Sequence, residues 1–139
     1  MKAAIYSQKK DLDTFLYLSK FISELNKRGV KAIIYEQLFK DLEFSKEFST
    51  FSNYEDVKQE KIDFFFSFGG DGTILNALNF IKELEIPIIG VNTGRLGFLA
   101  SFSKEEIFSN IDEIITKERN LSKKSVLHVT SSGTPIDFP

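Results

Sequence analysis

Hydrophobic positions along the chain form short runs that alternate with stretches of helical periodicity. The runs predict four buried strands, at residues 2–7, 30–36, 62–68 and 86–91. Between the first two lies a predicted helix whose apolar face consists of Phe15, Leu18, Ile22 and Leu25. Gly29 stands where the C-cap of that helix is expected. The run at 62–68 has almost no polar interruption, which is typical of a strand buried on both faces.

Two further helices follow from the same pattern. One is predicted over about residues 73–84, between the third and fourth strands. Another should begin near Ser103 and Glu106, whose spacing is that of a capping box, ahead of Ile107, Ile111 and Ile114. Strands that alternate with helices predict an α/β fold with an open parallel sheet.

Two segments are less regular. Residues 37–61 carry Phe39, Phe44, Phe48 and Phe51 among many charges, and we interpret them as a helix plus a mobile loop. Residues 126–130 alternate like a half-exposed strand, and Ser131, Ser132 and Gly133 suggest a hairpin turn. We therefore expect an α/β domain over residues 1–119 and the beginning of an incomplete β-rich domain over 120–139.

Composition narrows the classes of partner. The chain has 139 residues, about one domain, with 42% hydrophobic and 27% charged residues. No apolar run reaches the roughly 20 residues of a membrane span, and no signal peptide is apparent. A net charge of -2 makes nucleic acid a poor partner. With no cysteine in the sequence, we expect a cytoplasmic protein that acts on small molecules, without a membrane or nucleic-acid partner.

The glycines show where ligand chemistry is expected. Six of the eight are Gly69, Gly70, Gly72, Gly90, Gly94 and Gly97, which we place at the carboxyl ends of the third and fourth strands. Ligands of open α/β sheets bind at that edge. The stretch GGDGT at 69–73 offers bare backbone N–H groups and a positive helix end, which favour a phosphate. It matches neither the P-loop pattern nor the dinucleotide fingerprint.

A ligand-free turn is the alternative, with Asp71 serving only to cap the following helix. A second glycine-rich segment at 90–100 makes a site the better interpretation. It follows the next strand and adds a cation, Arg95, and an aromatic residue, Phe98. In a parallel sheet the two segments converge.

These two segments resemble the N-terminal motifs of the NAD kinases. The first, GGDGT, is shared with diacylglycerol and sphingosine kinases, whereas GVNTGRLGFL at 90–99 is specific to NAD kinases. The resemblance covers only the N-terminal portion of such an enzyme. It implies a Rossmann-like parallel sheet with flanking helices, followed by the first strands of a truncated β-rich second domain.

The resemblance also implies roles for individual residues. Asp71 would accept the proton of the 2′-hydroxyl of the adenosine ribose of NAD. The remaining roles are phosphate binding by Gly69, Gly70, Gly72 and Thr73, lining of the adenine pocket by Phe98 and Leu99, and support of that loop by Asn92. Asn76 stands where some members have a basic residue. The phosphoryl donor would be ATP or polyphosphate, Mg²⁺ would arrive with ATP without an assigned protein ligand, and the full-length enzyme would be a homo-oligomer.

An ionised aspartate is a weak base towards an alcohol, but it suffices where the proton leaves late, as in phosphoryl transfer. This role predicts that Asp71→Asn lowers kcat and leaves NAD affinity nearly unchanged. The chain alone would be inactive. Two alternatives are a lipid kinase domain that uses the same GGDGT, and a nucleotide-binding module without turnover.

Overall fold

Six parallel strands form one open sheet in the computed structural model of the chain, which describes residues 1–38, 40, 48–95, 97–116, 121–126, 130–131 and 134–135. The strands are β1 (Lys2–Ser7), β2 (Lys31–Tyr35), β3 (Ser49–Phe51), β4 (Phe64–Phe68), β5 (Ile88–Asn92) and β6 (Phe102–Ser103). Their order is β3-β2-β1-β4-β5-β6, and every neighbouring pair is parallel. The order reverses between β1 and β4, so the crevice in which such sheets bind ligands lies at the carboxyl ends of these two strands.

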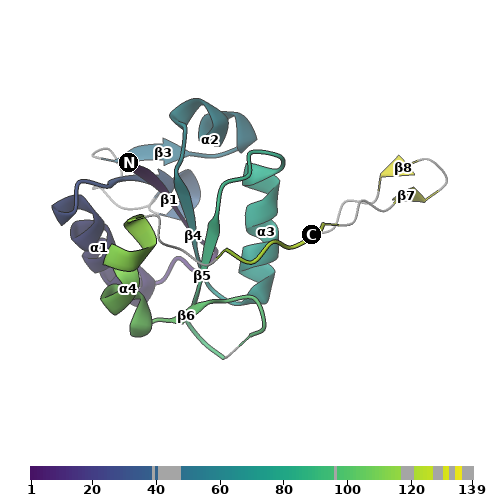
Figure 1. The fold of residues 1–139 in the computed structure, drawn as a ribbon. Helices are drawn as coiled ribbons and strands as arrows, with labels where there is room; N and C mark the ends of the chain where they lie inside the picture. Colours follow the sequence, from purple (N-terminus) through teal and green to yellow (C-terminus); the bar gives the residue numbers. More distant parts are fainter. Residues whose placement is uncertain are drawn as a thin grey trace.

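Helices cover both faces of the sheet (Figure 1). On one face lie α1 (Leu12–Lys27) and α4 (Glu106–Ile115), and on the other α2 (Tyr54–Glu60) and α3 (Asp71–Ile81). A short 3₁₀ turn, Glu36–Leu38, follows β2. The two faces form separate apolar clusters, so the prediction of an α/β fold with a parallel sheet is confirmed.

β4 supplies the centre of both clusters. Phe64, Phe66 and Phe68 face α1 and α4, whereas Phe65 faces α2 and α3. The ring of Phe21 packs edge-on against Phe66 and Phe68, with centroids 5.0 Å apart in each pair. The expectation that this strand is buried on both faces is therefore confirmed. The burial fixes the position of the end of β4, where the glycine turn begins.

Two of the predicted helix ends are confirmed by their caps, whereas the helix predicted over about residues 73–84 is α3, which begins at Asp71 and ends at Ile81. Gly29 follows α1 with φ at 73°, and its N–H donates to the Asn26 carbonyl at 3.0 Å. A left-handed residue at this position is readily supplied by glycine. Before α4, the Ser103 N–H donates to Glu106 Oε2 at 2.9 Å and the Glu106 N–H donates to Ser103 Oγ at 3.2 Å. This reciprocal pair is a capping box.

The interpretation of residues 37–61 as a helix plus a loop is right in that the segment contains a helix, α2, but it missed the strand β3. β3 pairs with β2 at the edge of the sheet, and α2 is a separate helix of seven residues. Phe51 is buried in β3 rather than on a helix face. Phe39 and Phe44 lie outside the described residues.

The predicted hairpin is present as a two-stranded antiparallel sheet of β7 (Thr130–Ser131) and β8 (Thr134–Pro135). Residues 121–126 have no regular structure, so the strand predicted to begin at Val126 does not begin there. Residues 127–129 and the turn at 132–133 lie outside the described part of the chain.

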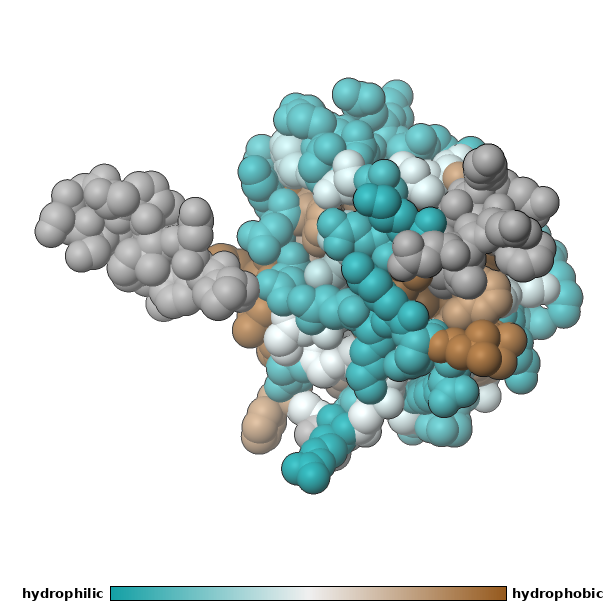
Figure 2. All heavy atoms as spheres, turned by 180° about the vertical axis from the view of Figure 1, so that it is seen from behind, coloured by the Kyte–Doolittle hydropathy of each residue, from teal (hydrophilic) through white to brown (hydrophobic). Residues whose placement is uncertain are grey.

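Polar residues dominate the face of the molecule that is turned away in Figure 1. Figure 2, drawn from behind, shows a largely hydrophilic face on which hydrophobic atoms appear in small separate areas. Among the described helices, none is long and apolar enough to cross a bilayer.

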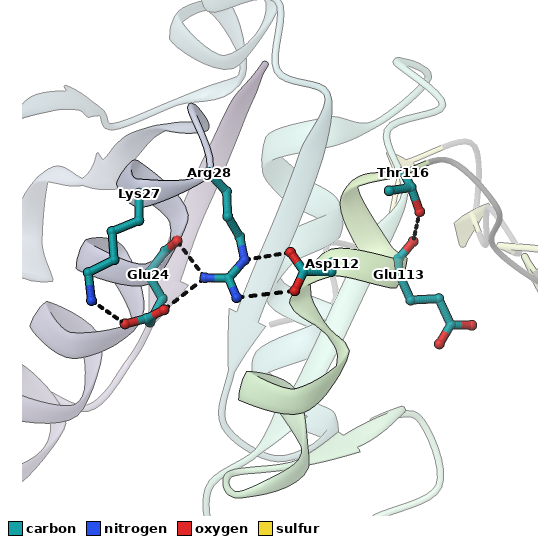
Figure 3. Close-up of polar contacts among 6 residues, drawn as sticks. All are labelled: Glu24, Lys27, Arg28, Asp112, Glu113 and Thr116. Carbon is teal, nitrogen blue, oxygen red and sulfur yellow. Dashed lines mark hydrogen bonds and ion pairs between the residues drawn. The ribbon is translucent and has the colours of Figure 1, made fainter.

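A charged cluster joins the two helices on one face (Figure 3). Arg28, at the end of α1, donates through Nε to Asp112 Oδ1 at 2.6 Å and through Nη2 to Asp112 Oδ2 at 3.2 Å. Its Nη1 donates to Glu24 Oε2 at 2.8 Å. The Arg28 guanidinium holds the pKa of the Asp112 carboxyl below its usual range. Because the contact with Asp112 is bidentate, it fixes the orientation of α4 as well as its distance from α1.

Asp112→Asn should therefore lower the melting temperature at neutral pH. A carboxyl group whose pKa is lowered by folding stabilises the fold above its pKa in the unfolded chain, and this contribution is lost as the pH falls through the lower folded-state pKa. The measurement is thermal unfolding, followed by circular dichroism, at several pH values between about 7 and 2.

Glu113→Gln is the matched control, because it removes the same charge from the next residue, whose carboxylate lies away from Arg28 in Figure 3. The melting temperatures of the two variants should differ at neutral pH and converge as the pH falls from about 4 through the lower folded-state pKa of Asp112. A difference that stays constant over the whole range would contradict a role for the ionised Asp112 carboxylate.

Candidate functional site

Two chain segments meet at the carboxyl edge of the sheet. The first is the glycine turn at 69–70 between β4 and α3, and the second is the loop at 93–101 between β5 and β6. The Gly69 N–H donates to the Val91 carbonyl at 2.9 Å, and the Ser101 N–H donates to the Gly90 carbonyl at 2.9 Å. The convergence expected from the sequence is confirmed, since backbone hydrogen bonds hold both segments to the same strand, β5.

Asp71 is the first residue of α3 and its carboxylate faces the second loop. The helix is capped at Gly70 without a side-chain bond, so the alternative that Asp71 serves as the N-cap is wrong. Instead, Asp71 Oδ2 accepts the Phe98 N–H at 2.9 Å and Oδ1 accepts the Leu99 N–H at 3.0 Å. These two N–H donors, of which Phe98 has the larger effect, hold the pKa of the Asp71 carboxyl below its usual range. The side chain is therefore an ionised carboxylate at neutral pH.

Three glycines are required by close contacts within the protein. A Cβ at Gly69 would lie 2.7 Å from Thr73 Cβ, and one at Gly97 would lie 2.7 Å from Asp71 Cγ. A Cβ at Gly90 would lie 2.9 Å from the Cα of Ala100. Gly90 lies inside β5, within the strand predicted over 86–91, and its missing side chain lets the second loop pack against the sheet.

Gly70 and Gly72 have no such requirement. A Cβ at either position would meet nothing within 4 Å, and neither has a positive φ. The open space beside them lies at the first turn of α3, where backbone N–H groups lack intrahelical partners and the helix dipole favours an anion. These two positions therefore fit a ligand with phosphate groups.

Thr73 is engaged with a residue that sequence reasoning missed. Its N–H donates to the Gly70 carbonyl at 3.0 Å, and its hydroxyl donates to Gln8 Oε1 at 3.2 Å. Gln8 directly follows β1, so this bond joins the first turn of α3 to the end of β1, beside the reversal of strand order. A direct contact of Thr73 with a phosphate would require its hydroxyl to leave Gln8.

Asn92, at the end of β5, shapes the start of the second loop. Its Nδ2 donates to the Arg95 carbonyl at 2.6 Å, and its Oδ1 accepts the Gly94 N–H at 2.9 Å. The side chain is buried, and the two bonds close a tight turn. Asn92 thus shapes the backbone of this loop, and its support of a nucleotide pocket stays a prediction. The Arg95 side chain is exposed.

Exposed apolar side chains lie next to the carboxylate. Phe98 is 100% exposed, Leu75 is 51% exposed and Leu99 is 36% exposed. Leu75 follows Asp71 by four residues, so both lie on the same side of α3. Sequence reasoning did not name Leu75, although this helical spacing from Asp71 could have identified it.

The α1 side of the same edge has a hollow of about 190 Å³. Its lining includes Lys9, Lys104, Thr14 and Thr93, none of which sequence reasoning selected. The hollow lies where the start of α1 packs against the end of β4. No local sequence pattern predicts that contact between distant segments. In the described part of the chain, no three His, Cys, Asp or Glu side chains gather into a metal-binding group.

The similarity of the chain to known proteins identifies its family. The model of the ATP-NAD kinase N-terminal domain matches residues 8–119. The chain belongs to the NAD kinase family. It is 38% identical to the NAD kinase of Christiangramia forsetii over 99% of this chain and 48% of that protein. It is 34% identical to the NAD kinase of Cytophaga hutchinsonii over 86% of this chain and 42% of that protein. The chain thus spans about half the length of these curated relatives.

Solved structures share the fold of this chain. The yeast NADH kinase complexed with NADH matches with a TM-score of 0.68 at 22% identity, over 84% of this chain and 38% of that chain. An NAD kinase from Archaeoglobus fulgidus in complex with ATP matches with a TM-score of 0.54 at 26% identity, over 85% of this chain and 38% of that chain. The expected Rossmann-like fold with flanking helices is therefore confirmed.

Gly90→Ala should destabilise the fold by about 1–3 kcal/mol, because the added methyl group would overpack against the backbone of Ala100. This cost exceeds the roughly 0.4–1 kcal/mol that a glycine-to-alanine change gains from the unfolded chain. Urea denaturation measures the difference in free energy of unfolding. Gly94→Ala is the control, since its Cβ meets nothing within 4 Å. Equal stability of the two variants would show that the close approach at Gly90 is not required.

Proposed function

We propose that this chain forms the nucleotide-binding half of an NAD kinase. The reaction transfers the γ-phosphoryl group of ATP, or a phosphoryl group of polyphosphate, to the 2′-hydroxyl of the adenosine ribose of NAD. The observation that carries the proposal is the Asp71 carboxylate, which lies between an open glycine turn and the exposed side chains of Phe98 and Leu99. Around the Asp71 carboxylate, this arrangement offers places for a phosphate, a hydroxyl group and a flat apolar base.

The phosphates are assigned to the turn before α3. Gly69 and Gly70 lead into the helix, Gly72 and Thr73 form its first turn, and the open space beside Gly70 and Gly72 lets phosphate oxygens approach the backbone N–H groups. The structure of the relative from Archaeoglobus fulgidus contains ATP, which supports a nucleoside triphosphate as the phosphoryl donor. Mg²⁺ would arrive with ATP and neutralise charge on the transferred group.

NAD, the phosphoryl acceptor, is assigned to the second loop. Phe98 and Leu99 present apolar surface for the adenine, and Asn92 holds the turn that precedes them. In the reaction, the 2′-oxygen forms a bond to the γ-phosphorus while the bond to the β–γ bridging oxygen breaks, and ADP leaves with that electron pair. The hydroxyl proton passes to Asp71. An aspartate with a lowered pKa is a weak base, which suffices because the proton leaves late in a loose transition state.

The remaining expectations belong to the whole enzyme. A β-rich second domain beginning near residue 120, a homo-oligomeric assembly and a cytoplasmic location are parts of this proposal. The two-stranded sheet of β7 and β8 is in keeping with the first of these.

The 139-residue chain alone should form no NADP above a no-protein control when incubated with NAD, ATP and magnesium. The reason is that catalysis by positioning fails when part of the substrate pocket is missing. A chimaera that joins this chain to the part of the Christiangramia forsetii NAD kinase beyond the aligned region should form NADP. Steady NADP formation by the chain alone would contradict the need for a second part, and a folded chimaera that binds neither NAD nor ATP would contradict the kinase proposal.

Asp71→Asn in the chimaera should lower kcat by roughly 10²–10⁴, because the amide cannot accept the hydroxyl proton. Initial rates of NADP formation measure this loss. Asp63→Asn provides the control, since Asp63 lies at the opposite end of β4 and its carboxylate accepts the Lys2 N–H at 2.8 Å. An Asp71→Asn enzyme with near-normal kcat would contradict the assignment of Asp71 as the base.

A further inference from the structure

The Asp71 carboxylate has two fixed partners within the chain. Phe98 donates to one oxygen and Leu99 to the other, at 2.9 and 3.0 Å. The donors are consecutive backbone N–H groups that lie 27 and 28 residues away along the chain. This bidentate contact joins the start of α3 to the loop between β5 and β6, two segments that are distant in sequence.

The missing side chain of Gly97 belongs to the same contact. A Cβ at this position would lie 2.9 Å from Asp71 Oδ2 and 2.7 Å from Cγ, so the loop backbone passes directly over the carboxylate. On either side, the loop is held by Asn92 at Gly94 and Arg95 and by the Gly90 carbonyl at Ser101. Among the described residues of the intervening stretch 97–100, the hydrogen bonds that fix the backbone are those to Asp71.

Side-chain packing does not replace these bonds. The Phe98 side chain is 100% exposed and the Leu99 side chain is 36% exposed, so neither holds the loop in place by burial. An exposed segment of this kind is ordered by its hydrogen bonds, and charge-assisted bonds are the stronger kind.

We propose that Asp71 is also the positioning residue of the second loop, so that its charge is needed for NAD binding in addition to the transfer step. The inference rests on the proposed function, which assigns Phe98 and Leu99 to the adenine pocket. Each carboxylate oxygen keeps a second acceptor position when one N–H is bound. The acceptor hydroxyl therefore binds to a carboxylate that simultaneously holds the wall of its own pocket.

This inference changes the expected behaviour of Asp71→Asn. The sequence alone predicted nearly unchanged NAD affinity, because an amide has the same shape. An amide, however, has one oxygen and one NH₂ group, so one of the two backbone N–H groups would face another donor. We now expect the dissociation constant for NAD to rise by roughly tenfold or more.

Gly97→Ala separates positioning from the chemistry. It keeps the carboxylate but places a methyl group against it, so the loop must move away from Asp71. Gly94→Ala is the matched control in the same loop, because its Cβ enters open space. Calorimetry with NAD, without ATP, on the chimaera should show the tenfold loss for Asp71→Asn and Gly97→Ala, and a change within about twofold for Gly94→Ala.

Two further measurements do not depend on affinity. Amide hydrogen exchange in the 139-residue chain without nucleotide should accelerate by about tenfold or more at Phe98 and Leu99 in Asp71→Asn and Gly97→Ala, and remain unchanged in Gly94→Ala. In the Gly97→Ala chimaera, the acid limb of the kcat/KM profile should move to higher pH, because a carboxylate without its N–H donors has a pKa nearer its usual value.

The outcomes distinguish this inference from the proposed function. Equal NAD dissociation constants and equal exchange rates for Gly97→Ala and Gly94→Ala, in a chimaera that binds NAD, overturn the positioning role and leave the base role standing. A folded, unsubstituted chimaera that binds no NAD overturns the proposed function and this inference with it.

Discussion

The close approach of the second loop to the start of α3 is the constraint on which the rest of the site depends. It exists because two Cβ atoms are missing. At Gly90 the gap lets Ala100 lie against β5, and at Gly97 it lets the backbone pass over Asp71. Closely packed interiors leave no slack for an additional methyl group at such points. The position of the carboxylate and the shape of the loop are therefore set together.

The sheet places these segments where they can meet. β4 is buried on both faces by phenylalanines, so its end is fixed in space, and β5 pairs with it in parallel. Both turns consequently leave the sheet at one edge, beside the reversal of strand order at β1. The Thr73 to Gln8 bond joins the helix to β1 at the same place. The core thus determines the geometry of a site that is itself mostly exposed.

Much of this arrangement could be predicted from the sequence, because it follows from local patterns. The apolar runs identified four of the six strands, and the caps at Gly29 and Ser103 were correct in detail. β3 and β6 were missed, since strands of three and two residues carry no periodicity and exist only through pairing with a neighbour. The partner of Asp71 was also beyond sequence reasoning, because no local signal indicates which distant N–H groups will face a carboxylate. Gly90 was grouped with the glycines expected to serve a ligand, whereas it allows close packing inside β5, and the sequence alone does not distinguish these two uses of a glycine.

The short edge strands have a consequence for the behaviour of the protein in solution. An unpaired strand edge is a template on which another chain can add a strand, and long flat edges promote aggregation. Here the outer strands, β3 and β6, have three and two residues. The long strands β1 and β4 lie inside the sheet, where neighbours use their backbone groups on both sides. β4, with its four phenylalanines, is thereby kept from intermolecular strand pairing for as long as the sheet remains folded.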